Sequence, residues 1–207
     1  MQLYAITDRR LFISVDTLLE QAILWAESSV DYVQIREKDL PANELAALAS
    51  WIVRAVRSAG GHTRVLLNGP AEMAAATGCD GVHLPSDAQV EAVAAARAAL
   101  RGTCADPVVS VSCHAAFEVE RAHKDGATLA LFAPVFEKQI WEKRLGVERI
   151  PGQGLAALAD ACRAVAPMPV FALGGVTVEN AGDCVRAGAA GVAAIRLFAA
   201  EAWRGLL

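Results

Sequence analysis

The chain has 207 residues, of which 55% are hydrophobic and 20% are charged, and its formal net charge is −4. This composition provides enough apolar material for one domain with a substantial core, and it argues against long disordered tails. The slightly acidic balance excludes a general electrostatic attraction to nucleic acid or to acidic membrane surfaces. The apolar runs are shorter than the roughly 20 residues that a membrane-spanning helix needs, and the N-terminus does not resemble a signal peptide.

Short β-rich runs alternate along the chain with longer stretches in which apolar residues have helical spacing. Several runs are apolar throughout, as strands covered on both faces are. The expected strands are LYAI (3–6), YVQIR (32–36), RVLL (64–67), GVHL (81–84), VVSVS (108–112), TLALF (128–132), PVFAL (169–173) and GVAAI (191–195). Eight strand–helix units predict an α/β fold, a single (β/α)8 TIM barrel spanning residues 1–207, with an open doubly wound sheet as the alternative.

The five cysteines are scattered and form no C-x-x-C pair. Neither a disulfide framework nor a zinc site is therefore expected, and the prediction is a cytoplasmic protein with reduced thiols.

The longest expected connection, residues 133–151, follows the sixth strand and carries Lys138 and Lys143 among apolar side chains. Long loops in compact domains are usually functional or disordered. A lid that covers the substrate and a solvated loop are both open interpretations.

In such a barrel, polar side chains at the carboxyl ends of the strands build the site. The second strand ends with Gln34, Arg36 and Lys38, which point the same way because alternate residues of a strand share a face. Two cations and an amide suit an anion such as phosphate or carboxylate, and a run of salt bridges on the outer face is the alternative. The third strand contributes Asn68 and the fourth contributes His83.

The fifth strand presents Ser112 and, just past its end, His114. Histidine is the side chain that most readily accepts and donates protons near neutral pH, so His114 is a candidate acid–base group. A packed or surface histidine is the alternative.

The seventh and eighth strands end in Gly174-Gly175 and Ile195-Arg196. Glycines let an anion approach backbone amides, and these two loops form the usual phosphate site of the barrel. The Arg196 guanidinium suits bidentate binding of phosphate, unless it points outward and pairs with a nearby glutamate.

Several motifs, taken in their order, resemble the thiamine phosphate synthase superfamily. They are YAITD (4–8), QIREKD (34–39), LLNG (66–69), GVHLPSD (81–87), SVSCH (110–114), FAPVFE (132–137), GQGL (152–155) and FALGGVTVENAGDCVRAGAAGVAAI (171–195). The resemblance covers nearly the whole chain and implies a (β/α)8 barrel. Barrels of this family are often dimers, so a homodimer is a possible assembly. The resemblance places the catalytic histidine at His114 and adds Gly154 to the candidate substrate-binding residues, which are Gln34, Arg36, Lys38, Asn68, His83, Lys138 and Lys143.

The superfamily has two branches. The synthase couples a pyrimidine pyrophosphate to a thiazole phosphate and releases pyrophosphate, whereas the thiazole tautomerase aromatises a carboxythiazole phosphate in the preceding step. The chain departs from the synthase pattern at both acidic positions, where Gly69 and Ala88 stand, and Asp87 is one position away. The Thr-x-Thr-Lys element that holds pyrophosphate is replaced by EKQIWEK (137–143). Magnesium normally needs one or two carboxylates beside the substrate phosphates.

The first hypothesis is therefore a metal-free thiazole tautomerase without a cofactor. In it, His114 moves the proton, Ser112 orients the ring or the substrate, and Arg36 or Lys38 binds the carboxylate. The phosphate would be held by Gly174, Gly175, Ile195 and Arg196. The second hypothesis is a synthase that uses Asp87, lysines of the 133–151 connection, and magnesium. The third is a non-catalytic regulatory barrel that binds a thiazole or thiamine phosphate. The first two take a phosphorylated thiazole as substrate.

Overall fold

The computed structural model describes residues 1–88, 90–142 and 146–207, and within them eight parallel strands form a closed barrel. The strands follow one another around the barrel in the order β1, β10, β9, β6, β5, β4, β3, β2. The single (β/α)8 barrel is confirmed, and the open sheet is excluded because β1 pairs with both β2 and β10. The bounds of the strands are β1 (Gln2–Ile6), β2 (Tyr32–Ile35), β3 (Arg64–Leu67), β4 (Gly81–Leu84), β5 (Val108–Cys113), β6 (Leu129–Phe132), β9 (Val170–Leu173) and β10 (Gly191–Ala194).

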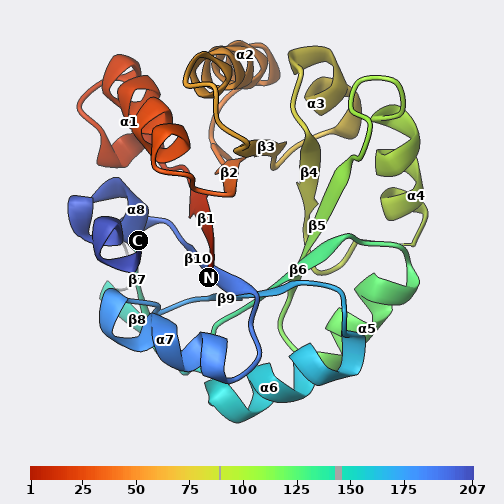
Figure 1. Ribbon diagram of the computed structural model, residues 1–207, viewed down its shortest axis with the longest axis vertical. Helices are drawn as coiled ribbons and strands as arrows, with labels where there is room; N and C mark the ends of the chain where they lie inside the picture. The colour runs from red at the N-terminus through yellow and green to blue at the C-terminus, as the bar shows by residue number, and fades with distance from the viewer. Residues whose placement is uncertain (89, 143–145) are drawn as a thin grey trace.

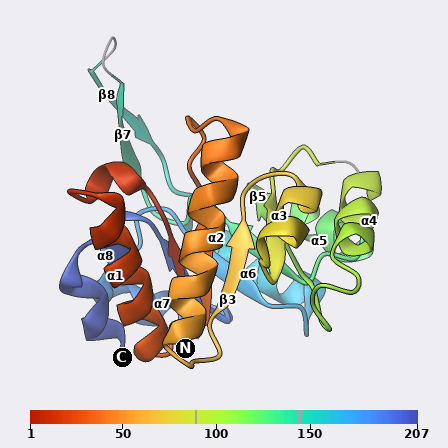
Figure 2. The same ribbon diagram turned by 90° about the horizontal axis from the view of Figure 1, so that it is seen from above.

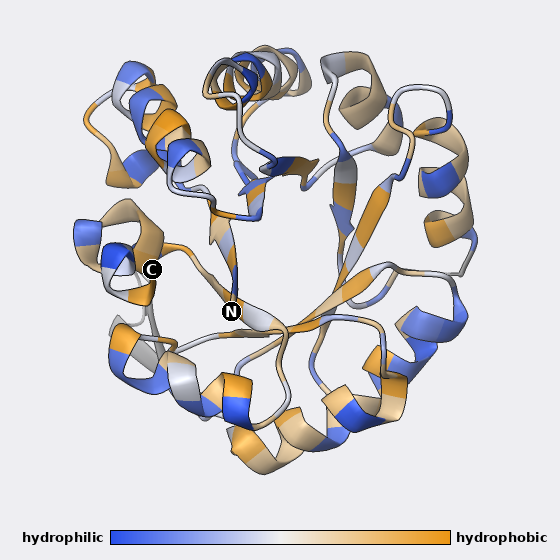
Figure 3. Ribbon diagram, in the orientation of Figure 1, coloured by the Kyte–Doolittle hydropathy of each residue, from blue (hydrophilic) through white to orange (hydrophobic). Residues whose placement is uncertain are grey.

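Helices surround the barrel, as Figure 1 shows. They are α1 (Val15–Glu27), α2 (Ala42–Ser58), α3 (Ala71–Thr77), α4 (Val90–Ala99), α5 (Ala116–Lys124), α6 (Gly154–Val165), α7 (Val178–Arg186) and α8 (Arg196–Ala199), with 3-10 turns η1 (Arg9–Leu11) and η2 (Glu201–Leu206). Hydrophobic and hydrophilic segments alternate along these helices (Figure 3), as expected of helices with one face on a barrel. Among the described residues, no helix combines the length and hydropathy that crossing a membrane requires.

The apolar core has two parts. The larger part lies between the barrel and the helices, and the smaller part fills the inside of the barrel. Inside, the ring of Tyr4 stacks on Tyr32 with centroids 5.4 Å apart and lies 5.5 Å from the ring of Phe171. The barrel is therefore a packed core rather than a pore, and a ligand is expected at its carboxyl end.

The connection after β6 differs from the prediction. In place of a long loop, β7 (Lys138–Glu142) and β8 (Gly146–Ile150) pair as an antiparallel ribbon. Figure 2 shows this ribbon projecting from the barrel on the side where the strands end. Its two segments lack a strict period-two pattern of apolar residues, so backbone pairing forms a hairpin that the hydrophobic pattern does not reveal.

Gly191 marks a place where β10 lies too close to β1 for a side chain. A Cβ there would clash with the carbonyl oxygen of Gln2, so the backbone of both strands would have to shift. We expect Gly191→Ala to lower the free energy of unfolding by about 3 kcal/mol, measured by chemical denaturation.

Gly182→Ala in α7 is the matched control for Gly191→Ala. There an added Cβ meets only the flexible side chain of Arg186, at 3.3 Å. Because alanine has a higher helix propensity than glycine, this substitution is expected to raise the free energy of unfolding by about 0.5–1 kcal/mol. Equal stability of the two variants would contradict the close approach of β1 and β10.

Candidate functional site

Polar side chains from the ends of β2, β3 and β4 gather at the carboxyl end of the barrel. Gln34 is buried and accepts a hydrogen bond from the hydroxyl of Tyr4 at 3.0 Å. The Asn68 amide donates to the backbone carbonyl of His83 at 3.1 Å. The first contact joins β1 to β2. The second joins the end of β3 to β4 and places Asn68 beside the end of β4.

Arg36 and Lys38 follow directly on β2. Both cations lie near enough to the buried side chain of His83 to lower its pKa electrostatically. The side chains predicted from the ends of β2, β3 and β4 therefore converge on one region, and their positive charge makes that region suitable for an anion.

His83 is held between two serines of β5. Its Nδ1 lies 2.8 Å from Oγ of Ser110, and its Nε2 lies 2.8 Å from Oγ of Ser112. Burial, followed by the charges of Arg36 and Lys38, lowers the pKa of His83 from 6.5 to about 3. The imidazole is therefore neutral near neutral pH, and it orders the two hydroxyls.

The lowered pKa of His83 predicts a pH dependence of stability. The unfolded chain binds this proton near pH 6.5, whereas the folded protein binds it only near pH 3, so the stabilisation is complete above pH 6.5 and is lost as pH falls toward 3. We expect His83 to contribute a fall of up to about 1.4 kcal/mol per pH unit in that window.

The measurement is the free energy of unfolding at pH 7, 6 and 5 for wild type and His83→Gln, which keeps polar atoms beside both serines. The variant should show a shallower slope. His123→Gln, on the exposed side of α5, is the control and should keep the wild-type slope. Identical slopes for wild type and His83→Gln would contradict the lowered pKa.

His114 lies just past β5 and is exposed to solvent. Its Nδ1 lies 2.7 Å from the carbonyl oxygen of Ala133, so Nδ1 donates and Nε2 is the basic nitrogen of the neutral ring. Its backbone amide donates to the carboxylate of Glu118. Ser112 does not orient this ring, because its hydroxyl is bonded to His83 and the carbonyl of Ala133 holds the ring of His114. A contact of Ser112 with the substrate stays a prediction.

Gly174 and Gly175 follow β9 with φ of +90° and +68°, a region that favours glycine. A Cβ at Gly174 would clash with Pro134, and one at Gly175 would clash with Phe136. The amide of Phe136 donates to the carbonyl of Gly174 at 3.0 Å. The close approach of the segment after β6 therefore explains why glycine stands at both positions. This structural explanation is independent of the predicted phosphate contact.

Ile195 and Arg196 follow β10, which pairs with β9, so they lie next to the Gly174-Gly175 turn. Arg196 begins α8 and is exposed. The glutamate of η2 nearest to it in sequence, Glu201, pairs instead with Arg204 at 4.0 Å. Binding of phosphate by this turn stays a prediction.

The remaining candidates lie around the segment after β6. Lys138 begins β7, and Lys143 lies outside the described residues. Gly154 begins α6 with φ of +86°, and its amide donates to the carbonyl of Val135 at 2.9 Å. Their roles in substrate binding stay predictions.

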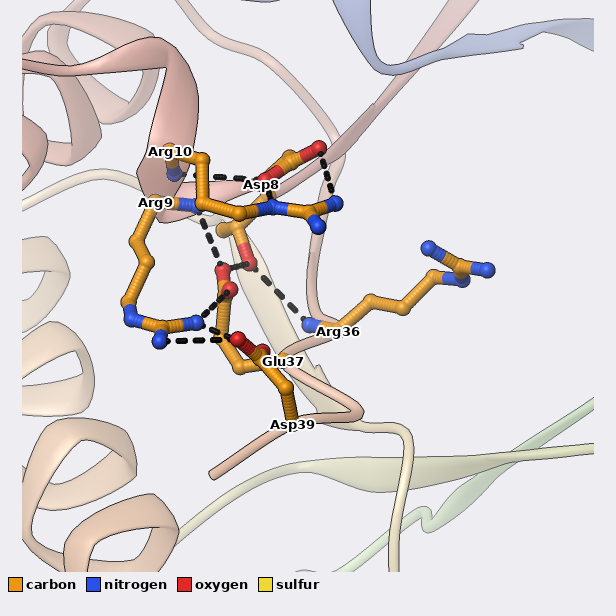
Figure 4. A network of polar contacts seen from close by, with 7 residues as sticks. Asp8, Arg9, Arg10, Arg36, Glu37 and Asp39 are labelled. Atoms are coloured by element: carbon orange, nitrogen blue, oxygen red, sulfur yellow. Dashed lines mark hydrogen bonds and ion pairs between the residues drawn. The ribbon is translucent and has the colours of Figure 1, made fainter. Parts of the chain in front are cut away.

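Thr7, Arg9 and Glu37 form a polar network between the loops after β1 and β2 that was not predicted from the sequence. Figure 4 shows Arg9 and Glu37 within it. Glu37 is 3% exposed, although it lies between two candidate anion-binding cations in sequence. An acidic residue within the REKD motif (36–39) was the visible sign of this network in the sequence. Its partners lie about 30 residues earlier in the chain, so spacing could not identify them.

Magnesium is the ion that the synthase branch implies. Gly69 and Ala88 offer no carboxylate at the two positions where the branch places its acids, and Asp87 is an exposed neighbour. Within the described residues, no group of three or more His, Cys, Asp or Glu side chains lies so as to hold a metal ion. These carboxylate positions therefore do not fit the pattern expected for magnesium. All five cysteines are free thiols.

The closed parallel barrel, with polar side chains where its strands end, places the chain in the class of (β/α)8-barrel proteins that build their site at this mouth. Within that class, the chain belongs to the thiamine monophosphate synthase family, whose family model matches residues 3–198.

Named proteins of this kind are similar over nearly the whole chain. The thiamine-phosphate synthase of Roseiflexus castenholzii is 31% identical over 93% of this chain and 78% of its own. The thiamine-phosphate synthase of Methanoculleus marisnigri is 31% identical over 96% of this chain and 88% of its own. The solved structure of thiamine phosphate pyrophosphorylase from Pyrococcus furiosus has a TM-score of 0.75 at 25% identity, covering 98% of this chain and 90% of that one.

Proposed function

We propose that this protein is an enzyme of thiamine biosynthesis that couples a pyrimidine pyrophosphate to a thiazole phosphate. This is the synthase reaction, the second of the hypotheses drawn from the sequence. The names of the relatives favour it over the tautomerase. The observation in the site that supports it is the pair of cations, Arg36 and Lys38, which lie near enough to His83 to lower its pKa, because the coupling reaction must bind and release a highly charged pyrophosphate.

The chemistry of the coupling balances without an external acid or base. The bond between the pyrimidine methylene carbon and the pyrophosphate oxygen breaks, and a bond from that carbon to the thiazole nitrogen forms. In this proposal, Arg36 and Lys38 stabilise the charge of the leaving pyrophosphate. Asn68 and Ser112, ordered by the His83 carbonyl and ring, orient the substrates.

A thiazole tautomerase is the second candidate, and the absence of acids at Gly69 and Ala88 favours it. Aromatisation of the carboxythiazole phosphate removes one proton and delivers another, and His114 presents a basic Nε2 on an oriented ring. Arg36 or Lys38 would then bind the substrate carboxylate instead of pyrophosphate.

One experiment separates the candidates. The purified protein is given the pyrimidine pyrophosphate and the thiazole phosphate with Mg²⁺, and thiamine phosphate and pyrophosphate are quantified. In parallel, it is given the carboxythiazole phosphate tautomer, and aromatisation is followed by absorbance. Coupling in equimolar yield of both products is the expected result. Aromatisation without coupling would replace the synthase by the tautomerase, and tight binding without either reaction would favour a regulatory barrel.

A further inference from the structure

We propose that Glu37 is a positioning residue that fixes the loop after β2 so that Arg36 is directed into the barrel mouth. The inference rests on the proposed function, because it concerns one of the cations that would bind the pyrophosphate. Its basis is a set of hydrogen bonds that join the loops after β1 and β2.

The carboxylate of Glu37 is the centre of this set. Its Oε1 accepts from the hydroxyl of Thr7 at 2.7 Å and from the backbone amide of Arg9 at 2.9 Å. Its Oε2 lies 3.3 Å from Nη1 of Arg9. With a residue exposure of 3%, this carboxylate is buried and bonded on both oxygens.

Thr7 transmits the restraint to Arg36. The buried Thr7 hydroxyl donates to Glu37 and accepts from the backbone amide of Arg36 at 3.0 Å. The amide of Thr7 donates to the carbonyl of Gln34 at 2.9 Å. The pairing of the two chain segments thus continues past the ends of β1 and β2, as far as Arg36.

The side-chain directions agree with this role. Figure 4 shows Glu37 turned toward Arg9, while the side chain of Arg36 extends away from that cluster. Arg36 directly precedes Glu37, and successive residues of an extended segment point to opposite sides. Holding Glu37 against the loop after β1 therefore directs Arg36 away from that loop.

Stability alone does not account for a buried carboxylate here. Arg9 already has a partner at the surface, since its Nη1 lies 2.7 Å from Oδ1 of Asp39, whose side chain is 53% exposed. Burying a second carboxylate beside the same guanidinium carries a desolvation cost that an ion pair often does not recover. The hydrogen bonds of Glu37 to Thr7 and to the Arg9 amide add a fixed loop geometry that Asp39 does not supply.

Isothermal titration with inorganic pyrophosphate tests the proposal. We expect Glu37→Gln to raise the Kd for pyrophosphate about tenfold. Thr7→Val, which keeps the shape but loses the hydroxyl, should raise it severalfold, and Thr7→Ser should restore the wild-type value. Asp39→Asn is the matched control, since it removes the other acid of Arg9, and its Kd should stay within twofold of wild type.

A double-mutant cycle shows whether Glu37 acts through its neighbour. In an Arg36→Ala background, Glu37→Gln should raise the Kd by less than threefold. An equal tenfold effect in both backgrounds, or a lowered Tm with an unchanged Kd, would overturn the positioning role. If the wild-type protein binds pyrophosphate but does not couple the two substrates, the synthase proposal is refuted and the positioning role of Glu37 is not. If the wild type does not bind pyrophosphate, both proposals fail.

Discussion

Arg36→Ala is expected to lower kcat/KM for the coupling reaction by roughly 10²-fold. Arg36 is one of two cations whose charge lowers the pKa of buried His83, and its backbone amide donates to Thr7, so its side chain begins from a restrained position at the mouth. Removing one partner of a buried, hydrogen-bonded charge pair costs about 2–5 kcal/mol, and a loss near the lower end of that range, about 2.7 kcal/mol, corresponds to a hundredfold change in rate.

Initial rates of pyrophosphate release at subsaturating substrate measure this effect. Arg54→Ala is a suitable control, because Arg54 is an exposed arginine on α2 and its removal changes the net charge equally. It should keep kcat/KM within about twofold. If Arg36→Ala also remains within twofold, Arg36 does not contact the anionic substrate and the cationic mouth loses its assigned role.

The barrel itself could be predicted from the sequence because parallel barrel strands are covered on both faces and appear as short apolar runs. The runs at 64–67 and 81–84 correspond to β3 and β4 with the expected bounds. The hairpin of β7 and β8 could not be predicted, because its pairing depends on backbone hydrogen bonds rather than on apolar spacing.

The side-chain partners in the site depend on register, which spacing alone does not determine. His83 lies opposite Ser110 in the pairing of β4 with β5, and this register brings its ring between Ser110 and Ser112. The sequence showed which residues share a face of each strand, but it could not show that Ser112 would contact His83 rather than His114. The contact of Glu37 with Thr7 likewise depends on how two loops meet after neighbouring strands.

His114→Ala is expected to separate the two candidate reactions. Coupling breaks a C–O bond and forms a C–N bond without a net proton transfer, so we expect its rate to stay within about threefold of wild type. Aromatisation requires one proton to leave carbon and another to be delivered, so a tautomerase activity should fall by roughly 10²- to 10⁴-fold when the acid–base group is removed.

Both assays are run on the same preparations of wild type, His114→Ala and His114→Gln, with circular dichroism to confirm folding. The ring of His114 is held by the carbonyl of Ala133, and its amide is bonded to Glu118 through the backbone, so replacing the side chain removes the first contact and keeps the second. A large loss of coupling in both variants would show that His114 contributes to substrate binding or to the coupling step. Aromatisation at the wild-type rate in both variants would show that another group moves the proton, and a wild-type protein without aromatisation would remove the tautomerase candidate.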